Sequence, residues 1–498
     1  MKKLLFSMLV LTAIVSNAQN VTIPDANFKN ALIAKGIDTS LDGEISYDEC
    51  VGIDELDIEN KYISDLTGIE AFVDLVELDC GANKLTSLDV SANTALEWLD
   101  CYYNQLSFLN ISGNLSLSYL RCWNNQLTSL DVSNNTALES LDFIDNLITS
   151  IDVSNNTGLI MLRCSNNQLT SLDASNKTAL GWLDCSGNQL TSLDVSNSTA
   201  LTYLHCANNQ LTSLDVSGNT ALESLDFSTN QISSIDVSSN VVLESLCCFK
   251  NQLTNLDISN NPALEYLWCG ENLIASLDLS NNTALGSLSC RYDQLSRLDL
   301  SNNTYLDFIN CSGNQLNSLV LPNNDLLYSL YCSDNLLVFL DVSDYTQLKY
   351  LKCSNNQLTN LNIFNNTALE WLIVSDMPSL YDVCVWEVPF SGVIDSINTE
   401  GSSNVNFRSD CAVGISDAYN EINKIDIYPN PSDNIINIET GIINNGIIEI
   451  YNISGRLVYS IETSKEIETI DMTGYPGGVY FVKVRQDRVV NIRKLVVE

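Results

Sequence analysis

Histidine is nearly absent from this sequence: His205 is the only one in 498 residues. This shortage excludes a Ser-His-Asp or Cys-His catalytic set and a histidine-rich zinc site, since each of these needs an imidazole beside its other groups. Carboxylate pairs of the glycosidase kind are the enzyme chemistry that the composition leaves open, because acidic residues are numerous.

Basic residues are also scarce. The chain has 23 lysines and arginines against 61 aspartates and glutamates, for a formal net charge of −38. A field of this sign repels phosphate backbones and anionic lipids. Nucleic acid and the surface of a membrane are therefore not expected as partners, whereas solubility and divalent cations are favoured.

Long apolar runs are missing after the start of the chain. Lysines precede an apolar run over residues 4–15, and the small residues Ser16 and Ala18 occupy the cleavage positions. This pattern predicts a signal peptide over residues 1–18. No later run approaches the length of a membrane-spanning helix. We expect a protein that is secreted or on the outer cell surface, with a mature chain that begins at Gln19.

The sequence is dominated by one unit of 21 residues, which recurs from residue 80 to residue 374 without insertion or deletion and reads close to LxxLxCSxNQLTSLDVSNNTA. One copy contains about six apolar side chains, whose burial contributes roughly 1.5–3 kcal/mol each, against about 1.5 kcal/mol of ordering cost for every residue. A single copy therefore cannot fold. About fifteen stacked copies can, because each covers the apolar side of the next, and the period predicts a solenoid.

Each copy predicts one short strand and one polar ladder. In residues 96–109, Leu99 and Cys101 alternate with outward side chains, which is the pattern of a strand with one buried face. An asparagine follows this strand in most copies, and stacked amides there can satisfy the backbone of a turn. We expect this ladder at Asn83, Asn104, Asn125, Asn146, Asn167, Asn188, Asn209, Asn230, Asn251 and Asn272.

These residues resemble the leucine-rich repeat family, whose LxxLxLxxNxL signature is matched with cysteine in place of the third leucine. The second half of the unit, LDVSNNTAL at residues 130–138, repeats the pattern more weakly and is similar to the nested 21-residue bacterial class. That resemblance implies a back side of extended chain without helices. We predict a β-rich solenoid of short strands and turns with few or no helices, followed by a small all-β sandwich domain.

Twelve of the 16 cysteines share one position of the repeat. Neighbouring strands lie about 4.8 Å apart, a distance that admits disulfides or a column of thiolates around metal ions. Phe143, Phe227 and Val374 fill the same position, however, and leave runs of three cysteines that cannot pair completely. We therefore predict buried thiols that act as small hydrophobic side chains. They are Cys80, Cys101, Cys122, Cys164, Cys185, Cys206, Cys248, Cys269, Cys290, Cys311, Cys332 and Cys353.

Four cysteines lie outside this column. Cys384 and Cys411 belong to a segment without the repeat, which follows the last copy and is expected to cover its apolar end. We predict a disulfide between them, which suits an oxidising compartment. Cys50 and Cys247 have no assigned partner.

Aromatic side chains concentrate at the outward positions of the predicted strands, together with several of the few arginines. Cross-strand pairing that stiffens the sheet, worth a few tenths to about 1 kcal/mol per pair, is one explanation. A recognition surface is the other, which we favour because aromatic residues and arginine anchor interfaces. The candidate ligand-binding residues are Trp98, Tyr102, Tyr119, Arg121, Trp123, Arg163, Trp182, Tyr203, Tyr266, Trp268, Tyr350 and Trp371.

An aspartate recurs on the back side of the repeat. Like charges at this spacing repel, so we expect neighbouring hydroxyls and backbone amides to hold them in a hydrogen-bonded stripe. Weak calcium binding along the stripe is the alternative. The column comprises Asp89, Asp131, Asp152, Asp173, Asp194, Asp215, Asp236, Asp257, Asp278 and Asp299.

Residues 38–49 read DTSLDGEISYDE, which matches a twelve-residue calcium loop position by position, with Gly43 at the turn. The preceding residues 27–35 suit a short amphipathic helix, and the segment resembles an EF-hand-type or dockerin-like half-site. Ca²⁺ in this N-terminal cap is therefore the one cofactor that we expect, and a tight loop without an ion is the alternative. The candidate ligands are Asp38, Ser40, Asp42, Glu44 through its carbonyl, Ser46 through a water and Glu49 as a bidentate carboxylate.

The period ends before Cys411, and the remaining residues contain short alternating strands that predict a small β-sandwich. KIDIYPNP at residues 424–431, GGVYFVKV at 477–484 and the terminal KLVV at 494–497 resemble the C-terminal sorting domain of type IX secretion cargo in Bacteroidetes. The resemblance implies the type IX machinery as a partner, transit across the outer membrane and removal of this domain. Release, or attachment to surface polysaccharide, would follow.

We predict six segments: a signal peptide (1–18), an N-terminal cap (19–58), the repeat solenoid (59–375), a C-terminal cap (376–412), a linker (413–423) and the sorting domain (424–498). A solenoid offers no closed pocket, so we expect no enzyme.

The leading hypothesis is a protein that binds another protein, as an adhesin or an adaptor-like scaffold. Glycan recognition, with Trp98, Trp182 and Trp371 stacking on the sugar rings of a surface polysaccharide, is the competitor. A purely structural role in a coat or matrix is the third hypothesis.

Overall fold

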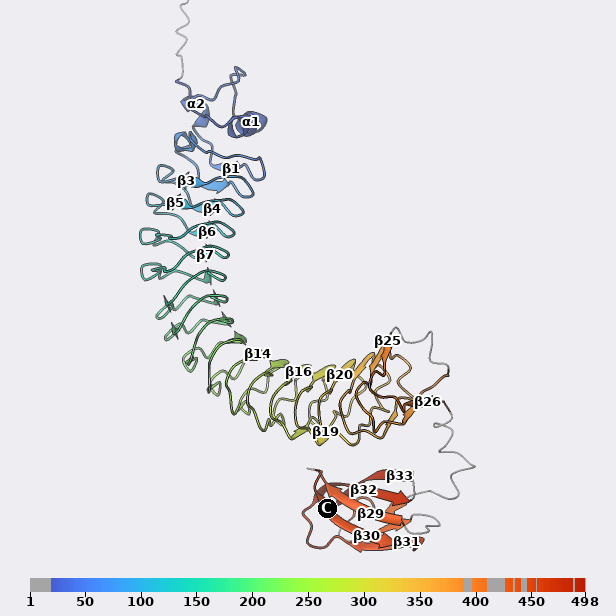
Figure 1. Cartoon of the computed structure of the whole chain (residues 1–498). Helices are drawn as coiled ribbons and strands as arrows, with labels where there is room; N and C mark the ends of the chain where they lie inside the picture. The colour runs from blue at the N-terminus through green and yellow to red at the C-terminus, as the bar shows by residue number, and fades with distance from the viewer. Residues whose placement is uncertain are drawn as a thin grey trace, which may run out of the picture. The chain divides into compact units, whose positions relative to one another are not determined.

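The computed structural model describes residues 19–388, 396–409, 426–432, 435–439, 446–453, 455–486 and 489–497. The chain divides into two compact units, Met1–Leu211 and Thr212–Glu498. Each contains a stack of short parallel strands, and the second also contains an antiparallel β domain (Figure 1). The predicted signal peptide lies outside the described residues.

The first unit begins with a small helical cap. Helix α1 (Ala26–Ala34) starts at Asp25, whose carboxylate accepts hydrogen bonds from two backbone N–H groups of the first turn. Helix α2 (Tyr47–Cys50) starts with a capping box. The 3₁₀ helix η1 (Ile69–Ala71) completes the helical content of the described part of the chain, so the prediction of few helices is confirmed.

The repeats of the first unit form one parallel sheet in strict register. Residues one period apart face each other on neighbouring strands, as Trp98 faces Tyr119, because the repeat contains no insertion. The sheet strands are β1 (Glu55–Asp57), β2 (Glu77–Asp79), β4 (Trp98–Asp100), β6 (Tyr119–Arg121), β7 (Ser140–Asp142), β8 (Met161–Arg163), β10 (Trp182–Asp184) and β12 (Tyr203–His205). A second set of strands lines the back side: β3 (Ser87–Asp89), β5 (Phe108–Asn110), β9 (Leu172–Asp173) and β11 (Leu193–Asp194).

The repeats of the second unit are built in the same way. The sheet strands are β13 (Ser224–Asp226), β14 (Ser245–Cys247), β15 (Tyr266–Trp268), β16 (Ser287–Ser289), β18 (Phe308–Asn310), β20 (Ser329–Tyr331), β21 (Tyr350–Lys352), β23 (Trp371–Ile373) and β25 (Ser396–Asn398). The back strands are β17 (Arg297–Asp299), β19 (Ser318–Val320), β22 (Asn360–Asn362), β24 (Asp382–Cys384) and β26 (Asn406–Arg408). The predicted β-rich solenoid is therefore confirmed.

The turns bury side chains at the same positions of the repeat. Leu99 in the centre of β4 and Cys101 just after it are fully buried, as the alternating pattern predicts. The N–H of Cys101 donates to the carbonyl oxygen of Arg121 in the next turn at 2.8 Å. The backbone of the sheet thus finds its partners between turns rather than within them, and stacking is a condition of folding.

The predicted asparagine ladder, which we name the first ladder, is present. The Oδ1 atom of Asn104 accepts the N–H of Leu85 in the preceding turn at 2.9 Å. Its Nδ2 atom donates to the carbonyl oxygens of Cys80 and Cys101 at 3.1 and 3.2 Å. It also donates to the carbonyl oxygen of Tyr102 at 3.1 Å, so one amide joins two turns through four hydrogen bonds.

A second ladder of asparagines lies in the other half of each repeat. The Nδ2 atom of Asn114 donates to the carbonyl oxygens of Val90 and Asn93 at 3.0 and 2.7 Å, and the side chain is fully buried. The same pair of contacts recurs at Asn135, Asn156, Asn240, Asn261, Asn282, Asn303 and Asn366.

The cysteine column is buried and its members remain thiols, so the prediction of small hydrophobic side chains is confirmed. Burial raises their pKa values, to about 12 at Cys311, which disfavours thiolate chemistry. Cys50 and Cys247 also remain thiols. Cys384 in β24 is disulfide-bonded, while its predicted partner Cys411 lies outside the described residues, so that pairing stays a prediction.

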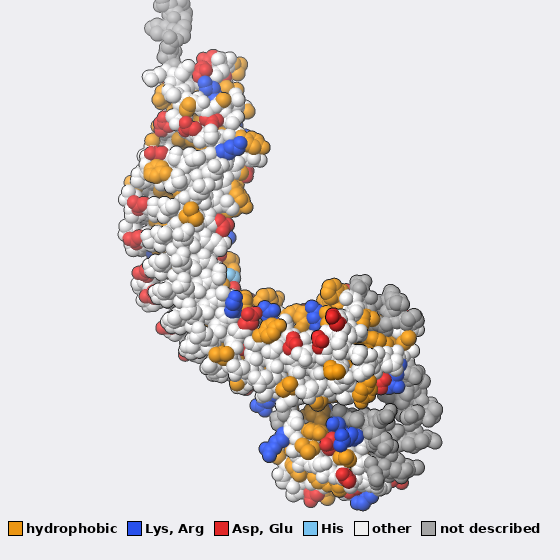
Figure 2. All heavy atoms as spheres, viewed as in Figure 1, with side chains coloured by type: hydrophobic (Ala, Val, Ile, Leu, Met, Phe, Trp, Pro, Cys, Tyr) orange, Lys and Arg blue, Asp and Glu red, His pale blue; other side chains and the backbone are white. Residues whose placement is uncertain are grey.

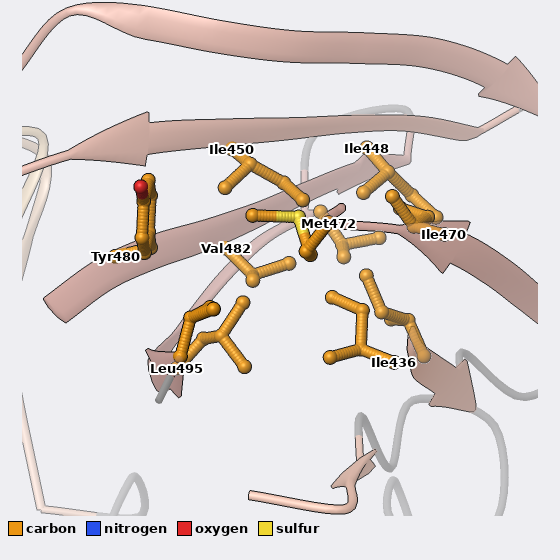
Figure 3. Close-up of a cluster of buried hydrophobic side chains, with 11 residues drawn as sticks. Ile436, Ile448, Ile450, Ile470, Met472, Tyr480, Val482 and Leu495 are labelled. Atoms are coloured by element: carbon orange, nitrogen blue, oxygen red, sulfur yellow. The ribbon is translucent and has the colours of Figure 1, made fainter. Parts of the chain in front are cut away.

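The C-terminal residues form a separate antiparallel domain of two sheets, which confirms the predicted all-β domain. Figure 3 shows Ile436 and Ile470 of one sheet meeting Ile450, Val482 and Leu495 of the other in a buried core. The first sheet contains β27 (Asp426–Tyr428), β28 (Ile435–Glu439) and β31 (Ile467–Asp471). The second contains, in spatial order, β30 (Leu457–Thr463), β29 (Gly446–Asn452), β32 (Gly478–Gln486) and β33 (Val489–Val497).

Within the described ranges, the structure contains no helix with the length and apolar character needed to cross a bilayer. The domain boundaries derived from the sequence stay predictions.

Candidate functional site

The outward side chains of the sheet strands, and of the residues directly after them, form what we name the sheet face. Over β4 and β6 it carries five rings, the first aromatic cluster: Trp98, Tyr102, Tyr103, Tyr119 and Trp123. Trp98 and Tyr119 stack with ring centroids 3.4 Å apart and planes 10° apart, and Tyr102 and Trp123 stack at 5.1 Å and 8°. Tyr103 meets Trp123 edge-on at 4.4 Å. Strand register produces the stacks, because the stacked residues are one period apart.

Arg121 occupies the middle of this cluster. Its guanidinium carbon lies 5.9, 5.5 and 5.2 Å from the ring centroids of Trp98, Tyr102 and Tyr119. Two hydrogen bonds to Asp100 hold it, one from Nε at 2.7 Å and one from Nη2. These bonds raise the pKa of Arg121, and Asp100 is only 2% exposed. The cation is therefore fixed in one orientation among the rings.

A second aromatic cluster lies over β10 and β12 and comprises Trp182, Tyr203 and His205. Trp182 and Tyr203 stack at 3.5 Å and 14°, and Tyr203 stacks on His205 at 3.8 Å. The Tyr203 hydroxyl also lies 2.7 Å from Nδ1 of His205. Arg163 on β8 pairs with the buried Asp142 at 2.9 Å. The first unit thus places all eight of its predicted ligand-binding residues on one face.

The sheet face of the second unit is less continuous. Tyr350 and Trp371 meet edge-on at 6.1 Å, and Trp371 is 40% exposed. Tyr266 and Trp268 on β15 are 53% and 48% exposed. In Figure 2 hydrophobic, basic and acidic side chains gather along the edge where Figure 1 labels β14, β16 and β20. All twelve predicted ligand-binding residues therefore lie on the sheet face, while their binding of a ligand stays a prediction.

The calcium-like loop is closed by its own hydrogen bonds. The Asp38 carboxylate accepts the N–H groups of Asp42 and Gly43 at 3.2 and 2.9 Å, and it is 5% exposed. The Glu49 carboxylate accepts the N–H groups of Ser46 and Ser40 at 2.9 Å each, which lowers the pKa of Glu49 to about 2. Both carboxylates thus have partners without an ion.

The remaining candidate ligands of this loop also have partners within the protein. The Asp42 carboxylate accepts the N–H of Glu44 at 2.9 Å, and the Glu44 carboxylate pairs with Lys29 at 2.8 Å. Ser40 and Ser46 donate their hydroxyl groups to the carboxylates of Asp38 and Glu49. No group of three acidic, cysteine or histidine side chains within the described residues is arranged to hold a metal. Calcium therefore stays a prediction.

The aspartate column on the back side is a hydrogen-bonded stripe, as expected. Each carboxylate accepts the backbone N–H of the serine two residues later, as Asp131 does from Ser133 at 3.0 Å. Hydrogen bonds from the same serine hold the pKa of Asp131 below its ordinary value. Figure 2 shows acidic side chains recurring down one edge of the first unit. Local bonds thus stabilise the repeated charge.

Sequence reasoning missed the partners that hold the sheet face. Asp100 and Asp142 lie one period before Arg121 and Arg163, so the repeat spacing alone could have paired them. Gly81 was missed as well: a Cβ atom there would lie 2.7 Å from the Tyr102 ring. A glycine one period before a tyrosine is the signal that this contact leaves in the sequence.

Comparison with known proteins gives matches to both the repeats and the C-terminal domain. Residues 199–240 match the family model described as leucine rich repeats (2 copies), and residues 426–498 match the secretion system C-terminal sorting domain. Internalin J of Listeria monocytogenes serotype 4b (strain F2365) is 37% identical over 75 residues, which make up 15% of this chain and 8% of that protein. The match therefore spans only a small part of that relative's length.

Two of the solved structures that resemble this chain are informative. One is described as the functional domain of InlJ from Listeria monocytogenes, which includes a cysteine ladder; it is 28% identical with a TM-score of 0.60, and the alignment covers 97% of this chain and 100% of that one. The other is YopM from Yersinia enterocolitica WA-314, which is 25% identical with a TM-score of 0.54 over 68% of this chain and 74% of that one.

Fold, repeats and comparisons together define a leucine-rich repeat protein. Its C-terminal domain is a type IX secretion sorting domain, which indicates a secreted or cell-surface protein and implies contact with the secretion machinery. The Bacteroidetes-type origin of the chain, the EF-hand likeness of its cap and the absence of enzyme activity stay predictions.

Proposed function

We propose that this protein binds another protein through the sheet face of its solenoid and acts outside the cell as an adhesin or an adaptor-like scaffold. The observation that supports this most directly is the first aromatic cluster, in which three of the five rings lie within 6 Å of an arginine that a buried carboxylate already holds. Aromatic rings and arginine are the residues that most often anchor protein interfaces.

The side chains of the first aromatic cluster are preorganised for binding. Trp98 remains 36% exposed and Tyr103 52% exposed, although both rings contact a neighbour. Because stacking and the Asp100 hydrogen bonds already restrict these side chains, little conformational entropy remains to be lost on binding. The same aromatic residues can therefore both stiffen the sheet by cross-strand pairing and form a recognition surface.

Glycan recognition is the competing function. Trp268 and Trp371 favour it, because they are 48% and 40% exposed. Trp98 and Trp182 favour it less, since each has one ring face covered by a tyrosine at about 3.5 Å or less. A sugar that stacks on a tryptophan needs an open ring face.

Binding by the mature chain tests the proposal. The chain is offered to extracts of neighbouring cells for cross-linking and pull-down, and in parallel to a glycan array. Trp98→Ala and Trp182→Ala should each weaken capture of the protein partner by about 2 kcal/mol or more, roughly a thirtyfold rise in Kd. Tyr305→Ala is the matched control, because Tyr305 is 65% exposed but lies outside the strands; it should bind normally.

Two outcomes would contradict this function. Binding to polysaccharide alone, abolished by Trp371→Ala, would establish glycan recognition instead. Binding of neither kind would leave a structural role in a coat or matrix.

A further inference from the structure

Asp293 interrupts the first ladder of the second unit. The ladder positions one period before and after it are Asn272 and Asn314. Asp293 is as buried as they are, at 7% exposed against 6% and 8%. An acid therefore occupies a place that the repeat builds for an amide.

One oxygen of Asp293 reproduces the contact of the amide oxygen. Its Oδ1 atom accepts the N–H groups of Asn272 and Ile274 at 3.0 and 3.3 Å. In the next turn the Oδ1 atom of Asn314 likewise accepts the N–H of Leu295 at 3.0 Å. This half of the ladder contact is preserved.

The other oxygen lies where the neighbouring turns carry an NH₂ group. The Nδ2 atom of Asn272 donates to the carbonyl oxygens of Cys248, Cys269 and Gly270, which lie 24, 3 and 2 residues earlier, at 3.0, 2.8 and 3.2 Å. The Oδ2 atom of Asp293 is buried and has no hydrogen-bond partner. An ionised oxygen at this position meets acceptors instead of donors.

The carbonyl groups at these offsets from Asp293 belong to Cys269, Cys290 and Arg291. The first two each accept one hydrogen bond from a ladder amide, at 2.8 Å in both cases. The carbonyl oxygen of Cys248, in a regular turn, accepts two. Both cysteine carbonyls beside Asp293 thus have room for one more donor.

The titratable and charged groups around Asp293 do not stabilise its ionised carboxylate. The titratable groups that face it from the neighbouring turns are the thiols of Cys248, Cys269 and Cys290, whose pKa values burial raises and the Asp293 carboxyl raises further. Arg291 is exposed and pairs with Glu271 at 2.8 Å. Burial raises the pKa of Asp293 to about 7, although its two backbone N–H partners oppose that change.

We propose that Asp293 is a proton-dependent lock in the first ladder. As a neutral carboxylic acid it donates a hydrogen bond from its Oδ2–H group to the carbonyl oxygen of Cys269 or Cys290, and so restores the contact that an amide makes in the other turns. When the proton is lost, Oδ2 repels these carbonyl oxygens, and the turns beside Asp293 separate more readily. This part of the solenoid therefore loosens as the pH rises from mildly acidic to alkaline.

Hydrogen exchange of the full mature chain, followed by mass spectrometry at about pH 6 and about pH 8, tests the lock. The unfolded carboxyl loses its proton near the ordinary pKa of 3.8, whereas the folded one retains it until about 7. Opening around residue 293 should therefore increase about tenfold between the two conditions in the wild type, relative to Asp293→Asn at the same pH. The matched variant Asn314→Asp should create the same pH dependence one turn further on.

Infrared difference spectra at about pH 6 supply an independent readout. The wild type should show the C=O band of a protonated carboxyl group that Asp293→Asn lacks. Equal pH profiles for the wild type and Asp293→Asn, or no such band, overturn the proposal. So does protection by added calcium or sodium at alkaline pH that Asp293→Asn removes, because the carboxylate would then hold a cation against the carbonyl groups.

Discussion

Individual ladder positions show how strongly this solenoid depends on the amide side chain. In the second ladder of the first unit, Lys177 stands where the preceding turn has Asn156. Its Nζ atom donates to the carbonyl oxygen of Val153 at 2.8 Å, which is the contact that an asparagine makes with the residue 24 positions earlier. Lys177 is 3% exposed, and burial lowers its pKa. The lysine thus imitates the amide but carries a group that is costly to bury when charged.

Lys177→Asn should raise the melting temperature of the mature chain by a few degrees. The gain should be larger near pH 7 than near pH 10. The folded chain favours the neutral amine, so the lysine costs stability as the pH falls from its ordinary pKa of 10.5 toward the lowered folded value, and that cost persists at lower pH. Scanning calorimetry at both pH values measures the difference.

Ser198→Asn is the control for this substitution. Ser198 occupies the next position of the same ladder, and its hydroxyl donates to the carbonyl oxygen of Ala174 at 2.7 Å. The variant adds an amide without removing an ionisable group, so its effect should be equal at the two pH values. Equal effects for Lys177→Asn would contradict the interpretation.

Among the elements, strand register has the largest consequence. Parallel strands without insertions place side chains one period apart against each other, and this alone produces the Trp98–Tyr119 and Trp182–Tyr203 stacks.

The loop before α2 is stabilised differently, because its carboxylates accept hydrogen bonds from backbone N–H groups within the loop. A bound calcium ion would therefore share these carboxylates with the backbone N–H groups.

Calcium should raise the melting temperature of the N-terminal cap, and Glu49→Ala should remove that increment. Glu49 supplies both carboxylate oxygens in the predicted calcium site, yet it also caps α2, so the variant should be less stable even in chelator. The informative quantity is the difference between melting curves in calcium and in chelator.

Glu44→Ala separates the two roles. Only its carbonyl is a predicted ligand, and its side chain pairs with Lys29, so the variant should retain the calcium increment. A wild-type melting curve that is the same in calcium and in chelator would refute calcium binding.

At the scale of the whole molecule, the chain combines a strongly acidic solenoid with a separate sorting domain. The net charge of −38 does not prevent the turns from stacking, because backbone N–H groups hold the aspartates of the back side one by one. The sorting domain has a core of its own, built from both of its sheets. Export can therefore be impaired without damage to the repeats.

Ile450→Asp should unfold the sorting domain and retain the protein inside the outer membrane. Ile450 is fully buried, and a charge there costs about 3–5 kcal/mol or more, a large part of the stability of a domain of this size. Ile435→Asp is the matched control, since Ile435 lies in the same domain and is 55% exposed. Fractionation of a host with type IX secretion measures both; normal export of Ile450→Asp would disprove the role of the folded domain.

The 21-residue period was sufficient to derive the strand positions, the buried Leu99 and Cys101, the asparagine ladder and the common face of the aromatic residues. In a strict repeat, residues that lie 21 positions apart in the sequence are neighbours in space, so neighbouring side chains could be named without coordinates. The disulfide partner Cys411 and the signal peptide lie outside the described residues, and the sequence remains the only basis for them.

Other properties required the tertiary structure. The positions of Asp293 and Lys177 are visible in the sequence as breaks in a pattern, but their protonation depends on burial and on the carbonyl groups around them. The bonds that orient Arg121 depend on side-chain geometry across two turns. The period specifies which residues are neighbours. Desolvation and the direction of hydrogen bonds decide whether these residues are charged and how rigid they are. Desolvation and hydrogen-bond direction arise only when the turns are packed together, so one repeat read by itself does not reveal them.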